Sequence, residues 1–199
     1  MLETIFTTKI YETNMQGYDD ALRSRLVEDI DQLVSSNRGV KAPWAWGGLT
    51  TVPIMNFKST NIRDFATIID FIEYHMQQAW KQMGFAGKNA NTGLWINSTP
   101  PGGMTAVHDH IPAALSSCFY VDADPESGAL HLEDPMDQLQ RYQPRLEDMQ
   151  RYTNWMFDET IEVKSGKLVI WPAYLRHRSD INGMDRNRII FGMDARISK

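Results

Sequence analysis

The sequence predicts one α+β domain, residues 1–199, that is mainly β and has two helices before its strands. The apolar residues of two early stretches recur at spacings of three and four, which is the period of an α-helix. From Gly93 onward, short apolar runs are separated by Pro and Gly, as is typical of strands joined by turns. Helices followed by a block of strands favour a β part that closes into a barrel or a sandwich.

The N-terminal part should hold one short strand and two helices. Residues 4–11 alternate and should form the strand, whereas residues 39–53, dense in Gly, Pro and Trp, should be loop. The first helix should begin at Asp19, and its buried face comprises Leu22, Leu26, Ile30 and Leu33. The second helix should run from Asn61 to about Gly84, and its buried face comprises Phe65, Ile68, Ile69, Ile72, Met76 and Trp80.

The strands predicted in the second half are short and apolar. They cover residues 94–96, 116–121, 129–132, 160–163, 167–171 and 188–193. Trp95 and Trp171 are expected to belong to the barrel core. A polar segment, residues 136–155, is longer than a normal hairpin loop. Such an insertion forms either a lid over a substrate or a simple surface excursion, and the sequence favours neither.

Composition excludes several classes of protein. Hydrophobic residues make up 42% and charged residues 23% of the chain, as in an ordinary globular domain. The net charge of -5 would repel a phosphate backbone, so no nucleic-acid partner is expected. Neither a signal peptide nor a long apolar run occurs, and Cys118 is the single cysteine. We therefore expect a cytoplasmic protein without a membrane partner, and a homodimer as the default oligomer.

The histidines suggest a metal site. Five are present: His75, His108, His110, His131 and His177. In an extended segment, side chains two residues apart point to the same side, so His108 and His110 should project together while Asp109 points away. His177, on a distant strand, could supply a third imidazole. Three protein ligands leave coordination positions open, as catalysis requires. His75, in a helix, and His131, in a strand, are expected to be structural.

A set of motifs in the second half resembles a known family. The motifs are Trp95-x-Asn97, His108-x-His110, Ser116-x-Cys118-Phe119-Tyr120-Val121, Ser127-Gly128-Ala129-Leu130, Asp134-Pro135, Gly166-Lys167-Leu168-Val169-Ile170-Trp171-Pro172 with His177, and Arg188-Ile189-Ile190-Phe191. Their order and spacing are similar to the core of a family of 2-oxoglutarate- and Fe(II)-dependent oxygenases. That core reads Trp-x-Asn, then His-x-His with Pro, then Ser-Gly-Val-Tyr-Tyr. The resemblance covers residues 94–194, about half of the chain.

The resemblance implies a fold, an activity and a set of roles. The fold would be a double-stranded β-helix, or jelly roll, with the N-terminal helices packed against it. The activity would be hydroxylation of a peptidyl or small-molecule C–H bond, with Fe(II) as the metal, 2-oxoglutarate as cosubstrate and O2 as oxidant. Histidines 108, 110 and 177 would hold the metal. Arg188 would bind the distal carboxylate of 2-oxoglutarate, and Asn97 and Tyr120 would donate hydrogen bonds to it.

The chain also departs from the pattern of that superfamily. Most members have His-x-Asp or His-x-Glu, so Asp109 is an alternative ligand to His110, although it would need a bulge to turn inward. Three imidazoles could also favour Zn or Ni over Fe. Ile190 replaces a Ser that usually follows the Arg, and Ser117 replaces a Gly. Two other functions therefore stay open: a cupin-like three-His metalloprotein that does not use 2-oxoglutarate, and a jelly-roll binding module without catalysis.

Overall fold

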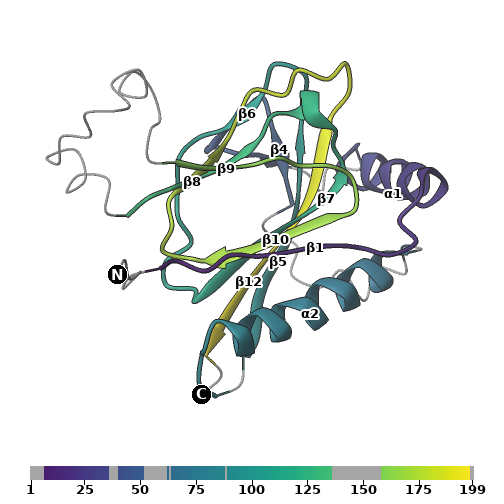
Figure 1. Ribbon diagram of the computed structural model, residues 1–199. Coiled ribbons are helices and arrows are strands. Elements are labelled where there is room, and N and C mark those ends of the chain that lie inside the picture. Colours follow the sequence, from purple (N-terminus) through teal and green to yellow (C-terminus); the bar gives the residue numbers. More distant parts are fainter. Residues whose placement is uncertain are drawn as a thin grey trace, which may run out of the picture.

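The computed structural model describes residues 7–35, 40–51, 62, 64–87, 89–135 and 158–197. Most of these residues form two helices and two facing sheets (Figure 1). The helices are α1 (Asp20–Leu33) and α2 (Phe65–Gln82). The strands are β1 (Tyr11–Asn14), β2 (Val40–Lys41), β3 (Ala45–Trp46), β4 (Leu49–Thr50), β5 (Asn89–Thr99), β6 (Met104–Thr105), β7 (Leu115–Asp122), β8 (Leu130–Glu133), β9 (Asp158–Ile161), β10 (Lys167–Pro172), β11 (His177–Ser179) and β12 (Arg188–Ile197).

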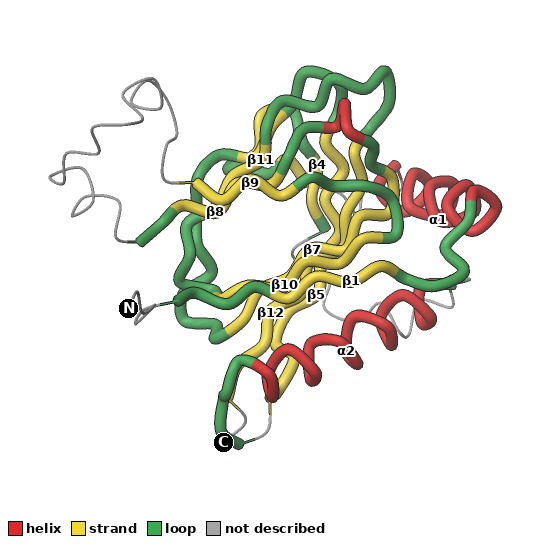
Figure 2. Tube along the Cα trace, in the orientation of Figure 1, coloured by secondary structure: helices red, strands yellow, loops and turns green. Residues whose placement is uncertain are grey.

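The larger sheet has seven strands in the order β1-β10-β7-β12-β5-β4-β2, and the smaller has three in the order β11-β8-β9. Every strand pairing in both sheets is antiparallel. Figure 2 shows the two helices on one side of the large sheet and the small sheet on the other. The central strands of the large sheet are therefore covered on both faces, and β10 is apolar along most of its length.

The two faces of the large sheet support separate hydrophobic clusters. On the helix side, α1 and α2 pack against alternate residues of β7 and β12, including Phe119 and Phe191. Phe65 of α2 meets Phe191 edge-on, with ring centroids 5.2 Å apart. Between the two sheets, the second cluster joins Tyr120, Trp171 and the apolar residues of β8. The intervening positions of β5, β7 and β12 are thus left to face the space between the sheets.

Both predicted helices are confirmed. The predicted face of α2 is fully buried, and Leu26, Ile30 and Leu33 of α1 are buried while Leu22 packs at the edge. The helix α2 begins at Phe65 and not at Asn61, which lies outside the described residues. Gly84, with a positive φ of 87°, directly follows the helix C-cap and lets the chain turn away.

Each predicted strand is present and in the predicted order, but the limits differ, and five further strands of two or three residues each are present: β2, β3, β4, β6 and β11. Among the described residues, the first strand is residues 11–14, which pair with the edge of β10; residues 4–6 of the predicted strand lie outside the described residues. The segment predicted as loop, residues 39–53, contains three strands of two residues each, too short for a periodic pattern. Strands β5 and β12 are longer than predicted. The insertion at residues 136–155 lies outside the described residues. Within the described part of the chain, no helix has the length and hydropathy to cross a membrane.

Candidate metal centre

Backbone pairing brings the three histidines to one place. His108 and His177 form an isolated antiparallel bridge, in which each backbone N–H donates to the other residue's carbonyl at 3.0 and 2.8 Å. The N–H of His110 donates to the carbonyl of Ala173 at 3.0 Å. The segment that leads into β7 is therefore fastened to the turn before β11. Residues 69 positions apart in the chain become neighbours as a result.

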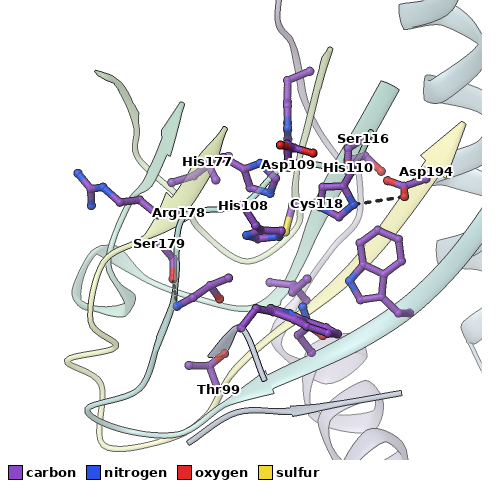
Figure 3. A pocket seen from close by; sticks show the side chains of 18 of the residues that line it. Thr99, His108, Asp109, His110, Ser116, Cys118, His177, Arg178, Ser179 and Asp194 are labelled. Atoms are coloured by element: carbon purple, nitrogen blue, oxygen red, sulfur yellow. Dashed lines mark hydrogen bonds and ion pairs between the residues drawn. The ribbon is translucent and has the colours of Figure 1, made fainter. Parts of the chain in front are cut away.

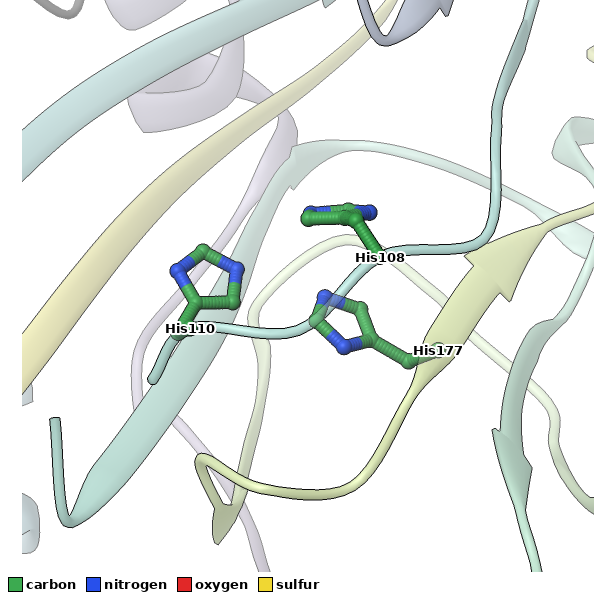
Figure 4. Close-up of side chains that lie close together, drawn as sticks. All are labelled: His108, His110 and His177. Atoms are coloured by element: carbon green, nitrogen blue, oxygen red, sulfur yellow. The ribbon is translucent and has the colours of Figure 1, made fainter. Parts of the chain in front are cut away.

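The three imidazoles surround a common point (Figure 4). One ring nitrogen from each of His108, His110 and His177 lies within 4.8 Å of the other two. The ring centroids are 4.3 to 5.1 Å apart. Imidazole nitrogens bind first-row metals at about 2.0–2.1 Å, so two nitrogens on one ion are at most about 4.2 Å apart, and small movements of these rings would bring all three to one ion. The grouping that the sequence predicted is present.

The hydrogen bonds of the rings fix which nitrogen is available. The Nδ1 atom of His108 lies 2.8 Å from the carbonyl of Ala106, and that of His177 lies 3.1 Å from the carbonyl of Leu175. The Nδ1 atom of His110 lies 3.2 Å from the carboxylate of Asp194. Carbonyl and carboxylate oxygens only accept, so each Nδ1 must carry the proton. All three Nε2 atoms are then left with a lone pair, which is the usual arrangement of histidine ligands.

The surroundings favour the neutral form of His108 and His177. Burial lowers the pKa of His177 well below its usual value, and the nearby His108 and His110 lower it further. Burial also lowers the pKa of His108, against the effect of its bond to Ala106. A proton and a metal compete for the same nitrogen, so rings that resist protonation are prepared for a cation.

The histidines open into a cavity of about 510 Å³ between the two sheets (Figure 3). Its wall includes Arg188, Asn97 and Tyr120, the residues predicted to contact a cosubstrate. Ile190 also lines it and pairs in register with Asn97 on one side and Tyr120 on the other. The apolar side chain thus stands between the two polar ones. The volume is within the range of ordinary ligand sites.

Arg188 is a buried cation with neutral partners. Its side chain is 4% exposed, and its guanidinium donates to the carbonyls of Ser127 and Asp180 and to Ser179 Oγ, the last at 2.6 Å. No carboxylate among the described residues forms an ion pair with it. Burial lowers its pKa, which reflects the cost of this charge. A buried guanidinium in this state is a site for an anion.

Two further polar groups in the wall need explanation. The Oδ1 atom of Asn97 is buried and has no hydrogen-bond partner within the described part of the chain. Burial raises the pKa of Tyr120 well above its usual value, so its hydroxyl keeps its proton. Asn97 therefore keeps hydrogen-bonding capacity for a ligand, and the Tyr120 hydroxyl can donate.

The remaining candidates lie outside the cluster. Asp109 is exposed and accepts from the backbone N–H of Ile111 at 3.1 Å, so its carboxylate does not join the three histidines. His75 is bonded to Tyr11 at 2.7 Å, and His131 to Asp180 at 2.7 Å. The structural roles expected for both are consistent with these contacts.

Sequence reasoning missed the residues that support His110. Trp95, expected in the barrel core, lines the cavity and stacks on His110 with ring centroids 5.3 Å apart and planes 13° from parallel. Asp194 was not singled out. One signal was available, because residues 188 and 194 are separated by an even number and share a strand face. Trp171 is core as predicted, 2% exposed, with its ring against His177.

Comparisons with known proteins agree on one family and one fold. Residues 93–194 match a protein family described as "Putative 2OG-Fe(II) oxygenase". No curated protein matches by sequence.

Several solved structures share the fold. A prolyl-4-hydroxylase from Pseudomonas putida shares 14% identity with a TM-score of 0.62, over 97% of this chain and 95% of that one. HygX from Streptomyces hygroscopicus shares 8% with a TM-score of 0.67, over 96% and 84%. A prolyl hydroxylase from Trichoplax adhaerens shares 10% with a TM-score of 0.65, over 95% and 84%. The predicted jelly roll is confirmed.

Proposed function

The chain belongs to the 2OG-Fe(II) oxygenase family, and on that premise we propose that it hydroxylates a C–H bond of a peptidyl or small-molecule substrate. In this proposal His108, His110 and His177 hold Fe(II), and Arg188 binds 2-oxoglutarate. One observation carries it: three imidazoles each bring a ring nitrogen within 4.8 Å of the other two, in a cavity whose wall also contains a buried guanidinium without a carboxylate partner among the described residues.

The donor set fits the metal. Imidazole nitrogens suit Fe, Zn, Cu and Ni, and three of them leave coordination positions for a cosubstrate and O2. Bound Fe(II) would supply the chemistry that couples the oxidative decarboxylation of 2-oxoglutarate to insertion of oxygen into the substrate. The protein's part is to orient the rings through Ala106, Leu175 and Asp194 and to keep water away with the apolar wall between the sheets.

The buried charge fits the cosubstrate. A guanidinium with only neutral partners gains most from a carboxylate that it can grip with two N–H groups. Asn97 has a free acceptor and an amide that can turn to donate, so it is the better of the two predicted hydrogen-bond partners. Ile190 offers contact to the methylene groups of 2-oxoglutarate where the superfamily usually has a hydroxyl.

The substrate class stays open between peptide and small molecule. Among proteins of this fold, a prolyl hydroxylase was solved with a peptide fragment of hypoxia inducible factor, and HygX was solved with hygromycin B. A substrate of either class would lie beside the metal. A cavity of about 510 Å³ has room for a side chain or a small molecule beside 2-oxoglutarate.

Succinate formation tests the proposal. Untagged protein is stripped of metal, loaded with Fe(II) without oxygen and then given 2-oxoglutarate and O2 with no other substrate. We expect slow succinate production that needs both Fe(II) and 2-oxoglutarate and is lost in His108→Ala. Metal binding near one equivalent without any succinate would instead favour the three-His metalloprotein that does not use 2-oxoglutarate. No binding of Fe, Zn, Ni or Mn would contradict both enzymatic functions.

A further inference from the structure

His110 is the exceptional ligand of the proposed site. Iron sites of two histidines and one carboxylate carry a negative charge in direct contact with the metal, and three neutral imidazoles do not. Among the described residues, one carboxylate is hydrogen-bonded to a ring of this cluster: Oδ2 of Asp194 lies 3.2 Å from Nδ1 of His110 (Figure 3). We propose that Asp194 is a positioning residue of the metal centre: it directs Nε2 of His110 to the metal and supplies, from behind the ring, the negative charge that the ligands lack. This inference rests on the proposed function.

The acceptors of the three rings differ in charge. His108 and His177 donate to backbone carbonyls, which orient a ring but bring no net charge. His110 alone donates to a carboxylate. If orientation were the whole requirement, a neutral acceptor would suffice here as it does for the other two. A carboxylate additionally polarises the imidazole and makes it a stronger donor to the metal.

The charge of Asp194 is not used elsewhere. Its side chain is 19% exposed and that of His110 is 16% exposed, so solvent screens the pair only in part. Within the described part of the chain, Asp194 pairs with no Lys or Arg, and its Oδ1 atom is buried without a hydrogen-bond partner. Strand β12 holds the carboxylate in place, opposite Ser116 of β7 and Gly93 of β5. The negative charge of Asp194 therefore acts mainly on the imidazole of His110.

The opposite side of the ring is also held. The indole of Trp95 stacks on His110, nearly parallel at 13°. The indole itself lies over Gly192, where a Cβ atom would come within 2.2 Å of Trp95 Cε2. Gly192 and Asp194 are two apart on β12, so one strand face supplies both the space for the indole and the carboxylate. Among the described residues, the only aromatic rings in contact with that of His108 are those of the other two histidines.

Metal affinity tests the inference without any turnover. Co(II) binding is measured by competition with a coloured chelator, in the absence of 2-oxoglutarate. Asp194→Asn keeps the size and an acceptor oxygen and removes the charge, and we expect it to weaken Co(II) binding about 10–100-fold. Asp64→Asn is the matched control, because it removes a carboxylate of similar exposure, 22%, which pairs with Arg25 at 2.9 Å outside the cluster and the cavity. The control should stay within about twofold of the native protein.

Two more variants separate charge from structure. Asp194→Glu keeps the charge and should bind Co(II) more tightly than Asp194→Asn; an equal or weaker affinity would refute a role for the charge. His110→Asp places a carboxylate on the metal directly, so adding Asp194→Asn to it should cause no further loss. The inference would be overturned if Asp194→Asn weakened Co(II) binding as much in the His110→Asp protein as in the native protein. It would also be overturned if Asp194→Asn did not weaken Co(II) binding in the native protein. Native protein that still binds Co(II) and forms succinate would leave the proposed function intact in either case.

Discussion

Gly192→Ala is the sharpest probe of how the candidate site is built. The added Cβ atom would lie 2.2, 2.4 and 2.5 Å from Cε2, Cζ2 and Nε1 of Trp95. Carbon atoms in contact normally stay about 3.5–4.0 Å apart, so the indole must move by more than about 1 Å. Gly192 is not among the glycines with positive φ, and its backbone suits alanine. The cost of the substitution is therefore steric.

The magnitude follows from two opposing effects. Overpacking of this severity costs about 2–3 kcal/mol, and replacing a strand glycine by alanine returns about 0.5–1 kcal/mol. The net loss in the free energy of unfolding is about 1–2.5 kcal/mol. A chain of this length loses about 2–4 °C in Tm per kcal/mol, so the metal-free protein should melt about 2–10 °C lower. Co(II) affinity should fall as well, because the displaced indole no longer stacks on His110.

The assay is a double-mutant cycle with Trp95→Ala, followed by thermal and urea unfolding of the metal-free protein. Once the indole is gone, the three atoms nearest to the added methyl group are gone with it, and the substitution should stabilise by about 0.5–1 kcal/mol. The effect thus changes sign between the two backgrounds. Equal losses in both would show that Trp95 is not the group that excludes a side chain at Gly192, and the reasoning would fail.

Three further outcomes are expected. Arg188→Lys should raise the KM for 2-oxoglutarate about tenfold or more in the succinate assay, because a charged two-point contact contributes about 1.5–3 kcal/mol; its Co(II) affinity without 2-oxoglutarate should not change. Burial raises the pKa of the Cys118 thiol to about 12 against the bond from Tyr120. The thiol therefore stays protonated at pH 8, and iodoacetamide should modify it about a thousandfold more slowly than a free cysteine, as followed by mass spectrometry. Saturating Zn(II) or Ni(II) at about 100 times its Kd should stabilise the native protein by about 2.7 kcal/mol, a rise in Tm of about 5–10 °C that His108→Ala should abolish.

The elements that could be predicted are those with a local pattern of apolar residues in the sequence. The buried face of α2 repeats its apolar residues every three or four positions, so both the helix and its orientation could be predicted. The two-residue strands β2, β3 and β4 have no period to detect. Their pairing depends on neighbours far away in the chain, such as Ser98 opposite Leu49. The first strand shifted for the same reason, since its limits are set by β10.

The candidate site, like the fold, has parts with a local sequence signal and parts without one. The pair of histidines two residues apart, with a third before the last strand, could be predicted because spacing and motif order are visible in the sequence. The ring of acceptors around Arg188 could not, because Ser127, Ser179 and Asp180 come from two separate segments and meet only through the fold. Burial then decides whether the guanidinium lacks a counter-ion, and the sequence does not give burial.

Strand β12 shows how a site can depend on register more than on motif. Its cavity face carries Arg188 at one end and Asp194 at the other, with Ile190 and Gly192 between them. Period two makes these four residues share a face, but only the pairing of β12 with β5 and β7 brings Asp194 to His110 and Gly192 under Trp95. A slip of one residue would turn both charged side chains toward the apolar cluster on the helix side. The register that buries Phe191 on the helix side therefore also places Arg188 and Asp194 in the wall of the cavity. A change that disrupts this part of the core should disrupt the metal centre as well.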